Sequence, residues 1–134
     1  MKVKSEFSVS KWNETKCGDP VNGMLLSNVS ATFEASGAIN GKLEVEYVMH
    51  YTNYNTENLY NATASYVGYL VFNGSVEGKS GSFVLEDKGI YTPAGPVSTL
   101  TVKPETGTGD LTGISGTGSY FAEGEKMVIE LEFS

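Results

Sequence analysis

The sequence predicts an all-β protein, a closed eight-stranded antiparallel meander barrel built from one domain that spans residues 1–134. Three observations predict this class. Apolar and polar residues alternate with a period of two, sixteen glycines punctuate the chain, and no stretch repeats its apolar residues at helical spacing. Closure is favoured because an open sheet of so many strands would expose two long edges.

Four strands are expected in the first half of the chain. In the first of them Val3, Ser5, Phe7 and Val9 share one face, until Trp12 breaks the alternation. Such a break suggests a β-bulge or the end of the barrel wall, where an indole can cover an opening. The four expected strands occupy about residues 2–10, 25–34, 43–51 and 64–74.

Four more strands are expected in the second half. The fifth carries Phe83 and Leu85 inward and is expected to end at the turn-like triplet Asp87-Lys88-Gly89. On this interpretation no carboxylate occupies an inward-facing strand position. Residues 107–120 are expected to form a turn that runs into the seventh strand, because five glycines there permit sharp coiling. The strands lie at about residues 82–86, 97–102, up to 121, and 127–133.

Aromatic residues on the inward phase suggest an internal cavity. An eight-stranded barrel is just wide enough either to fill with side chains or to hold one small ligand, and both alternatives stay open. If the barrel is hollow, its cavity suits a small apolar or aromatic molecule. No catalytic residue is assigned. The candidate ligand-binding residues are Tyr47, Met49, Tyr51, Tyr66, Phe83 and Tyr120.

The strand at residues 64–74 is apolar on both faces, and its outer face would carry Val67, Tyr69 and Val71. An exposed apolar face is most often covered by another subunit, so these residues are the candidate interface of a homo-oligomer. The polar, tyrosine-containing stretch at residues 52–61 is too long for a tight hairpin. It is expected to be either a lid or a mobile surface loop.

Charge and composition exclude several classes of function. Sixteen acidic residues against nine lysines, with no arginine, disfavour nucleic acid and anionic membranes as partners. Cys17 is the only cysteine and His50 the only histidine, so neither a disulfide nor a metal site is expected. No glycine-rich stretch has nucleotide-loop spacing, and no cofactor is expected. Without a signal-like or membrane-spanning stretch, the expected location is cytoplasmic.

The order and spacing of several motifs resemble the bacterial family catalogued as domain of unknown function 3224. That family is placed with the allene oxide cyclase-like barrels, so the resemblance implies a closed eight-stranded meander barrel. It also implies an alternative function, that of an isomerase or cyclase that steers a reaction inside its cavity, for which a buried carboxylate near the cavity would be the discriminating feature. The matching motifs are Trp12, Tyr66-Val67-Gly68-Tyr69, Gly74, residues 78–86, Gly89 and residues 107–119.

Overall fold

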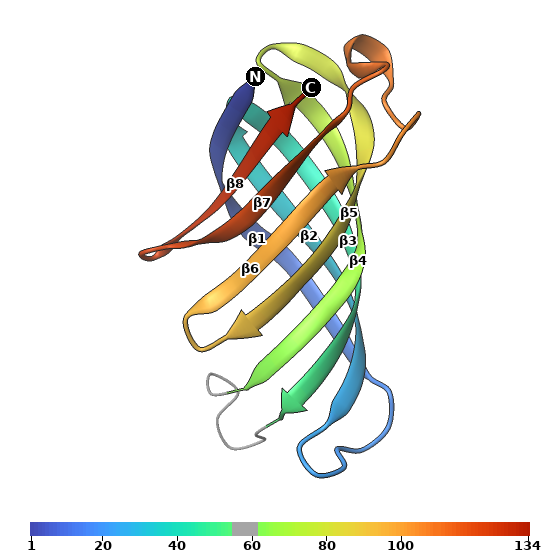
Figure 1. Cartoon of the computed structure of the whole chain (residues 1–134), viewed down its shortest axis with the longest axis vertical. Coiled ribbons are helices and arrows are strands. Elements are labelled where there is room, and N and C mark those ends of the chain that lie inside the picture. The colour runs from blue at the N-terminus through green and yellow to red at the C-terminus, as the bar shows by residue number, and fades with distance from the viewer. Residues whose placement is uncertain (55–61) are drawn as a thin grey trace.

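The computed structural model describes residues 1–54 and 62–134, which form a closed antiparallel barrel in which each strand pairs with its neighbours in the chain (Figure 1). The predicted fold class and the meander order are confirmed. A short 3-10 helix, Gly109–Leu111, lies between the sixth and seventh strands. The strands are β1 (Lys2–Lys16), β2 (Leu25–Gly37), β3 (Ile39–Asn53), β4 (Thr63–Val76), β5 (Lys79–Thr92), β6 (Gly95–Val102), β7 (Gly116–Glu123) and β8 (Lys126–Phe133).

The seam between β1 and β8 closes only half of the barrel. These strands pair from Lys2 opposite Glu132 to Phe7 opposite Met127. On its other side β1 pairs with β2 as far as Lys16, so the second half of β1 has β2 as its only strand partner among the described residues. Among the described residues no strand therefore closes the wall beside the second half of β1, and we call this end, which carries the β1–β2 connection, the open end of the barrel (Figure 1).

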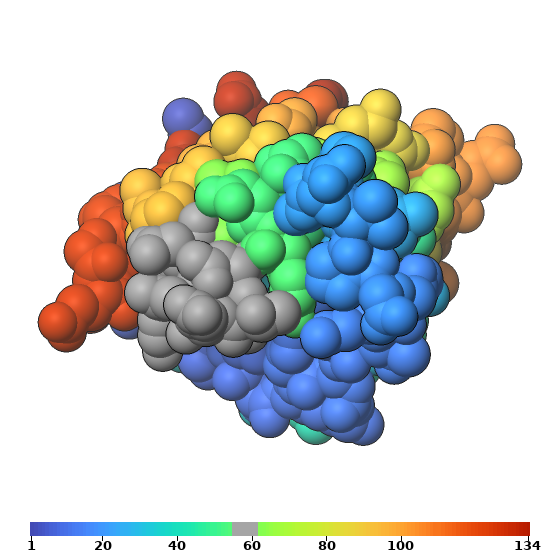
Figure 2. All heavy atoms as spheres, turned by 90° about the horizontal axis from the view of Figure 1, so that it is seen from below, coloured from blue at the N-terminus to red at the C-terminus, as the bar shows by residue number. Residues whose placement is uncertain are grey.

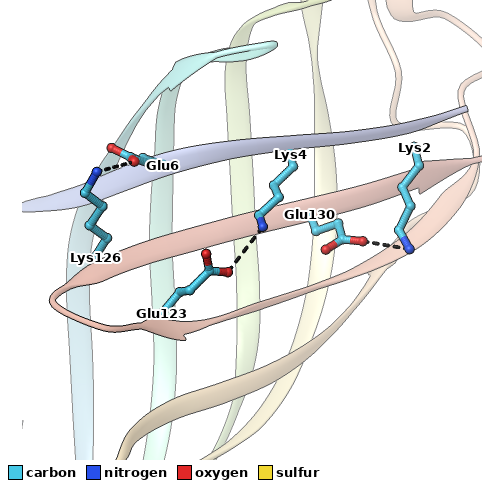
Figure 3. A network of polar contacts seen from close by, with 6 residues as sticks. All are labelled: Lys2, Lys4, Glu6, Glu123, Lys126 and Glu130. Atoms are coloured by element: carbon cyan, nitrogen blue, oxygen red, sulfur yellow. Dashed lines mark hydrogen bonds and ion pairs between the residues drawn. The ribbon is translucent and has the colours of Figure 1, made fainter.

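Ion pairs fasten the outside of the seam (Figure 3). Lys2 Nζ lies 2.8 Å from Glu130 Oε1, and Lys126 Nζ lies 2.9 Å from Glu6 Oε1. Lys4 also reaches Glu123 of β7, at 3.2 Å. Because most of these side chains are exposed and water screens their charges, each pair contributes little stability. The pairs still match β1 to its partner in one register.

The bulge that Trp12 suggested is present, since the β1–β2 register shifts between Val9 and Lys11. The shift brings Trp12 opposite the buried Ala31, so the indole lies on the inner face of the wall. It is nevertheless 44% exposed, because the barrel is open beside it. The bulge thus keeps β1 in phase with the barrel interior beyond the point where its pairing with β8 ends.

The expected end of the fifth strand was wrong. β5 does not end at Asp87-Lys88-Gly89 but continues to Thr92, because these residues pair in register with both β4 and β6. The glycine-rich stretch becomes a strand only from Gly116, after the 3-10 helix. The lid or mobile loop expected at residues 52–61 lies largely outside the described residues. Within the parts of the chain that the structure describes, no helix is long and apolar enough to span a membrane.

Candidate functional site

A pocket of about 230 Å³ lies inside the open end of the barrel. Figure 2 views the molecule from this end, with the β1–β2 connection in blue and the β7–β8 turn in orange-red toward the opposite side. The pocket shows that the interior of the barrel is hollow at this end. Its other end is packed, and there the rings of Phe72 and Phe133 lie against Phe83. The pocket is lined mainly by carbon, from Phe7, Val9, Trp12, Phe33, Tyr47, Met49, Tyr66, Tyr91, Pro96, Tyr120 and Met127.

Aromatic contacts hold the walls of the pocket in place. Phe7 stacks on Phe33 with ring centroids 5.0 Å apart, and Tyr120 meets Phe7 edge-on at 5.5 Å. On the facing wall the rings of Tyr47 and Tyr66 lie 4.8 Å apart. Each such pair adds about 1 kcal/mol beyond the area that it buries, so the walls are preformed.

A buried carboxylate, Asp87, lies directly behind the pocket. Tyr47 of β3, Gly68 of β4 and Asp87 of β5 are successive partners in one row across the sheet. Gly68 has no side chain to fill the inner face between the other two, and the Tyr47 hydroxyl spans it to donate a 2.6 Å hydrogen bond to Asp87 Oδ2. Asp87 itself is fully buried.

Tyr120 extends this hydrogen-bonded chain to β7. Its hydroxyl contacts that of Tyr47. Since the single proton of Tyr47 is already donated to Asp87, the Tyr120 hydroxyl donates to Tyr47 when Asp87 is ionised. Tyr120, Tyr47 and Asp87, from three strands, thus form a chain of hydrogen bonds in which each hydroxyl donates toward the carboxylate.

In the adjacent row of the sheet a second tyrosine hydroxyl passes over a glycine to reach a polar side chain on the next strand. Tyr66, Gly89, Ser98 and Tyr120 are successive partners across β4, β5, β6 and β7. The Tyr66 hydroxyl crosses Gly89 and hydrogen-bonds the buried Ser98 hydroxyl. A Cβ at position 89 would collide with the end of the Tyr66 ring and lie 2.7 Å from Ser98 Oγ. The absence of a Cβ at Gly89 therefore leaves the space that the Tyr66 hydroxyl and the Ser98 hydroxyl occupy.

Burial raises the pKa of Asp87 to about 6, against the opposing effect of the hydroxyls of Tyr47, Ser98 and Tyr120. Its second oxygen, Oδ1, has no hydrogen-bond partner among the described residues. Burial likewise raises the pKa of Tyr47 and of Tyr120, and the Asp87 charge adds to both shifts. The phenols stay protonated and Asp87 changes charge near neutral pH, so the site can respond to pH through this carboxylate alone.

Four of the residues expected to bind a ligand, Tyr47, Met49, Tyr66 and Tyr120, line this pocket together. Tyr51 lines an adjoining pocket, which is described below with the second carboxylate of the barrel. Phe83 is buried in the packed end, away from both pockets. The six predicted residues are all buried, and the interior phase assigned to them is confirmed.

The expectation that no carboxylate faces inward was wrong, because Asp87 does. The turn-like triplet concealed it. Continuing the period of two from Phe83 and Leu85 would have placed Asp87, Gly89 and Tyr91 on the inner face. Ser98 and Pro96 follow in the same way from the inward phase of β6.

The outer face of β4 exposes the three residues of the predicted interface, with Val67 48%, Tyr69 51% and Val71 45% exposed. His50 is exposed on the outer face of β3. Among the described residues no three His, Cys, Asp or Glu side chains lie close enough together to hold a metal ion.

Comparison with known proteins identifies the relatives of this barrel. The model of the family described as "Protein of unknown function (DUF3224)" matches residues 3–133. No curated protein matches the chain. A crystal structure of a DUF3224 protein of unknown function from Shewanella oneidensis MR-1 is similar to the chain, with a TM-score of 0.75 and 25% sequence identity. The alignment covers 100% of this chain and 96% of that one.

Proposed function

Because the chain belongs to the DUF3224 family, whose function is unknown, we propose a function from its own geometry: the barrel binds a small apolar or aromatic molecule in the pocket at its open end. The observation that carries this proposal is the pocket itself. The barrel interior is hollow at this end and packed at the other, and aromatic rings that contact one another form the walls of the pocket.

The chemistry of the lining indicates the kind of ligand. Cavities of roughly 150 Å³ lined by apolar side chains stay dry and admit benzene, so a pocket of about 230 Å³ has room for one substituted ring. The Tyr47, Tyr66 and Tyr120 hydroxyls are already hydrogen-bonded within the protein. They therefore leave a lining made almost entirely of carbon, which suits an apolar or aromatic ring with few polar groups.

Filling the pocket is expected to weaken binding. Val9 lines the pocket and is 48% exposed, and its replacement by Phe adds a ring at the entrance. We expect the Val9→Phe variant to bind 4-ethylphenol about tenfold more weakly, since overpacking typically costs about 1–3 kcal/mol. Calorimetric titration measures the difference. Native mass spectrometry of protein purified from cells would identify the natural molecule.

The matched control is Val97→Phe, which adds the same ring to the outer face of β6 at a valine that is 55% exposed. This variant should bind 4-ethylphenol like the wild type. Equal affinities for all three proteins, or no binding to any of them, would contradict the proposed pocket.

An isomerase or cyclase is the second candidate function, and Asp87 is the observation that favours it. A buried carboxylate whose pKa is raised to about 6 is suited to proton transfer near neutral pH. Asp87 does not line the pocket, so it would act through Tyr47, which does. Incubation of the recovered molecule with the protein decides between the two candidates, because an isomerase would convert it to a product of equal mass that chromatography separates from it.

We also propose that the outer face of β4 joins two copies of the chain. Val48 of β3 lies opposite Val67 and is 45% exposed, which extends the apolar strip. One lysine and three glutamates flank the strip: Lys88 lies beside Val67, Glu46 and Glu86 lie beside Tyr69, and Glu44 lies beside Val71. In two copies packed antiparallel across the strip, Lys88 of each copy would face glutamates of the other, which offsets part of the repulsion between like charges.

Replacing Tyr69 with Lys is expected to dissociate this dimer without unfolding the monomer, because Tyr69 is 51% exposed and an interface would desolvate the new charge. Sedimentation velocity measures the mass, and circular dichroism measures the fold. A wild-type protein that is monomeric at micromolar concentration would rule the dimer out. Ile90→Lys, on the outer face of β5, is the control, since Ile90 is similarly exposed.

A further inference from the structure

A second pocket, of about 190 Å³, adjoins the first at the mouth of the barrel. It is lined by Trp12, Met49, Tyr51 and Tyr91, and all of these except Tyr51 also line the first pocket. A ligand could therefore extend from one pocket into the other. The second pocket differs from the first in its electrostatics, because a carboxylate stands at its rim.

That carboxylate is Glu14, on the inner face of β1 beyond the bulge and opposite the buried Val29. It accepts hydrogen bonds from Ser27 Oγ at 2.6 Å and from Tyr51 Oη at 2.7 Å, both at Oε2. Trp12 Nε1 donates to Oε1 at 3.2 Å. Two of the three donors are themselves walls of the pocket, so Glu14 is held in a fixed position beside the aromatic rings.

All three donors are neutral, so the hydrogen bonds orient the Glu14 charge without cancelling it. Among the described residues no lysine nitrogen lies within ion-pair distance of Glu14, and residues 55–61 contain neither lysine, arginine nor histidine. The nearest lysine in the sequence, Lys16, instead places its ammonium over the ring of Tyr54, 5.0 Å from the centroid. The barrel mouth thus already holds one cation against an aromatic ring.

We infer that the second pocket binds a cationic amine group, so that the natural ligand of the barrel is an amphipathic organic cation with an apolar or aromatic body. The inference rests on the proposed function, because the body of the ligand occupies the first pocket. The cation lies among Trp12, Tyr51 and Tyr91 with Glu14 as its counter-ion. Aromatic faces and a carboxylate are the groups that recognise alkylated ammonium ions in proteins.

The surrounding charge agrees with a cation. The chain carries a net charge of −7 and no arginine, so its field attracts cations and repels anions. Burial and the neighbouring Glu14 carboxylate together raise the pKa of Tyr51, as expected where the local potential is negative. A carboxylate-bearing ligand would be repelled by Glu14, and the one ammonium described at the mouth, that of Lys16, lies over the ring of Tyr54.

Two probes of the same shape isolate the charge. Benzyltrimethylammonium and neopentylbenzene differ only in that a quaternary nitrogen replaces a quaternary carbon. Trp12 is the only tryptophan and lines both pockets, so its fluorescence reports binding directly. We expect the wild type to bind the cation at least about fivefold more tightly than the neutral probe, the range of an aromatic cage with partial desolvation.

Glu14→Gln keeps the shape and most hydrogen bonds but removes the charge. It should weaken binding of benzyltrimethylammonium by about fivefold and leave neopentylbenzene unaffected. Glu44→Gln is the matched control, because Glu44 also accepts a hydrogen bond from a neutral hydroxyl, that of Thr32, but on the outer face. Its affinities should equal those of the wild type.

The outcomes separate this inference from the proposed function. If the wild type binds both probes equally, the apolar pocket stands and the cation site is refuted, and the same holds if benzoate binds more tightly than the cation. If neither probe nor 4-ethylphenol binds, the proposed function itself fails. The comparison of probes on the wild type needs no variant, so it remains decisive even if Glu14→Gln does not fold.

Discussion

The Asp87→Asn variant is expected to gain stability relative to the wild type as pH rises from 4 to 7, by about 2 kcal/mol. The reason is the buried carboxylate. Its pKa is raised from 3.8 to about 6, so the folded state binds its proton more tightly than the unfolded state does. The wild type therefore loses stability as pH rises through this interval, while an amide has no proton to lose.

The rise of the Asp87 pKa from 3.8 to about 6 corresponds to about 3 kcal/mol of wild-type stability, which is present below pH 4 and lost above pH 6. Urea denaturation at pH 4, 5, 6 and 7 measures it for both proteins. The test is how the difference in free energy of unfolding between the variant and the wild type changes with pH. The value of that difference at any single pH is not the test, because the Asn side chain would lie where Oδ1 has no hydrogen-bond partner. An unpartnered amide adds a cost that does not depend on pH.

Asp19→Asn is the control, since it makes the same chemical change at an exposed aspartate. A difference between Asp87→Asn and the wild type that stays constant from pH 4 to pH 7 would show that Asp87 is not perturbed. The candidate isomerase function would lose its basis at the same time.

Gly68→Ala is expected to lower the free energy of unfolding by about 3 kcal/mol, at the upper end of the range for overpacking. A Cβ at this position would overlap the carbonyl oxygen of Glu46 and lie 2.9 Å from Tyr47 Cα. Both are backbone atoms of β3, so no change of rotamer relieves the clash. The strands would have to separate where Tyr47 crosses to Asp87.

Gly124→Ala is the comparison, in the β7–β8 turn. Gly124 has a φ of +65°, and among the described residues no atom lies within 4 Å of the position that an alanine Cβ would take. Its replacement therefore costs only the strain of a left-handed residue, about 1 kcal/mol. Denaturation midpoints measure both variants. If Gly68→Ala were no more destabilising than Gly124→Ala, the close approach of β3 and β4 would be refuted.

The two predictions test one structural idea from opposite sides. Asp87 is a charged group that the barrel holds at a cost in stability, and Gly68 is the gap that lets Tyr47 reach it. Groups with strongly shifted pKa values cluster at functional sites. Asp87 is for this reason the strongest single argument that the pocket has a chemical role.

The sequence by itself determined the architecture. The period of two assigned Tyr47, Tyr66 and Tyr120 to the interior, because side chains on a strand alternate between its faces whatever the strand pairs with. It also located the irregularity near Trp12. The boundary of β5 was misjudged because an Asp-Lys-Gly triplet has the local preference of a turn, and pairing with β4 and β6 overrides that preference.

Only the tertiary structure decided which inward residues meet. The register of four strands, β3 to β6, brings Tyr47 to Asp87, and Tyr66 to Ser98, across glycines that no local pattern marks as crossing points. The early end of the β1–β8 seam leaves one end of the barrel open, so Glu14 stands at a rim. Alternation assigns a face to each residue, whereas contacts across a barrel depend on register and closure, which the whole sheet sets together.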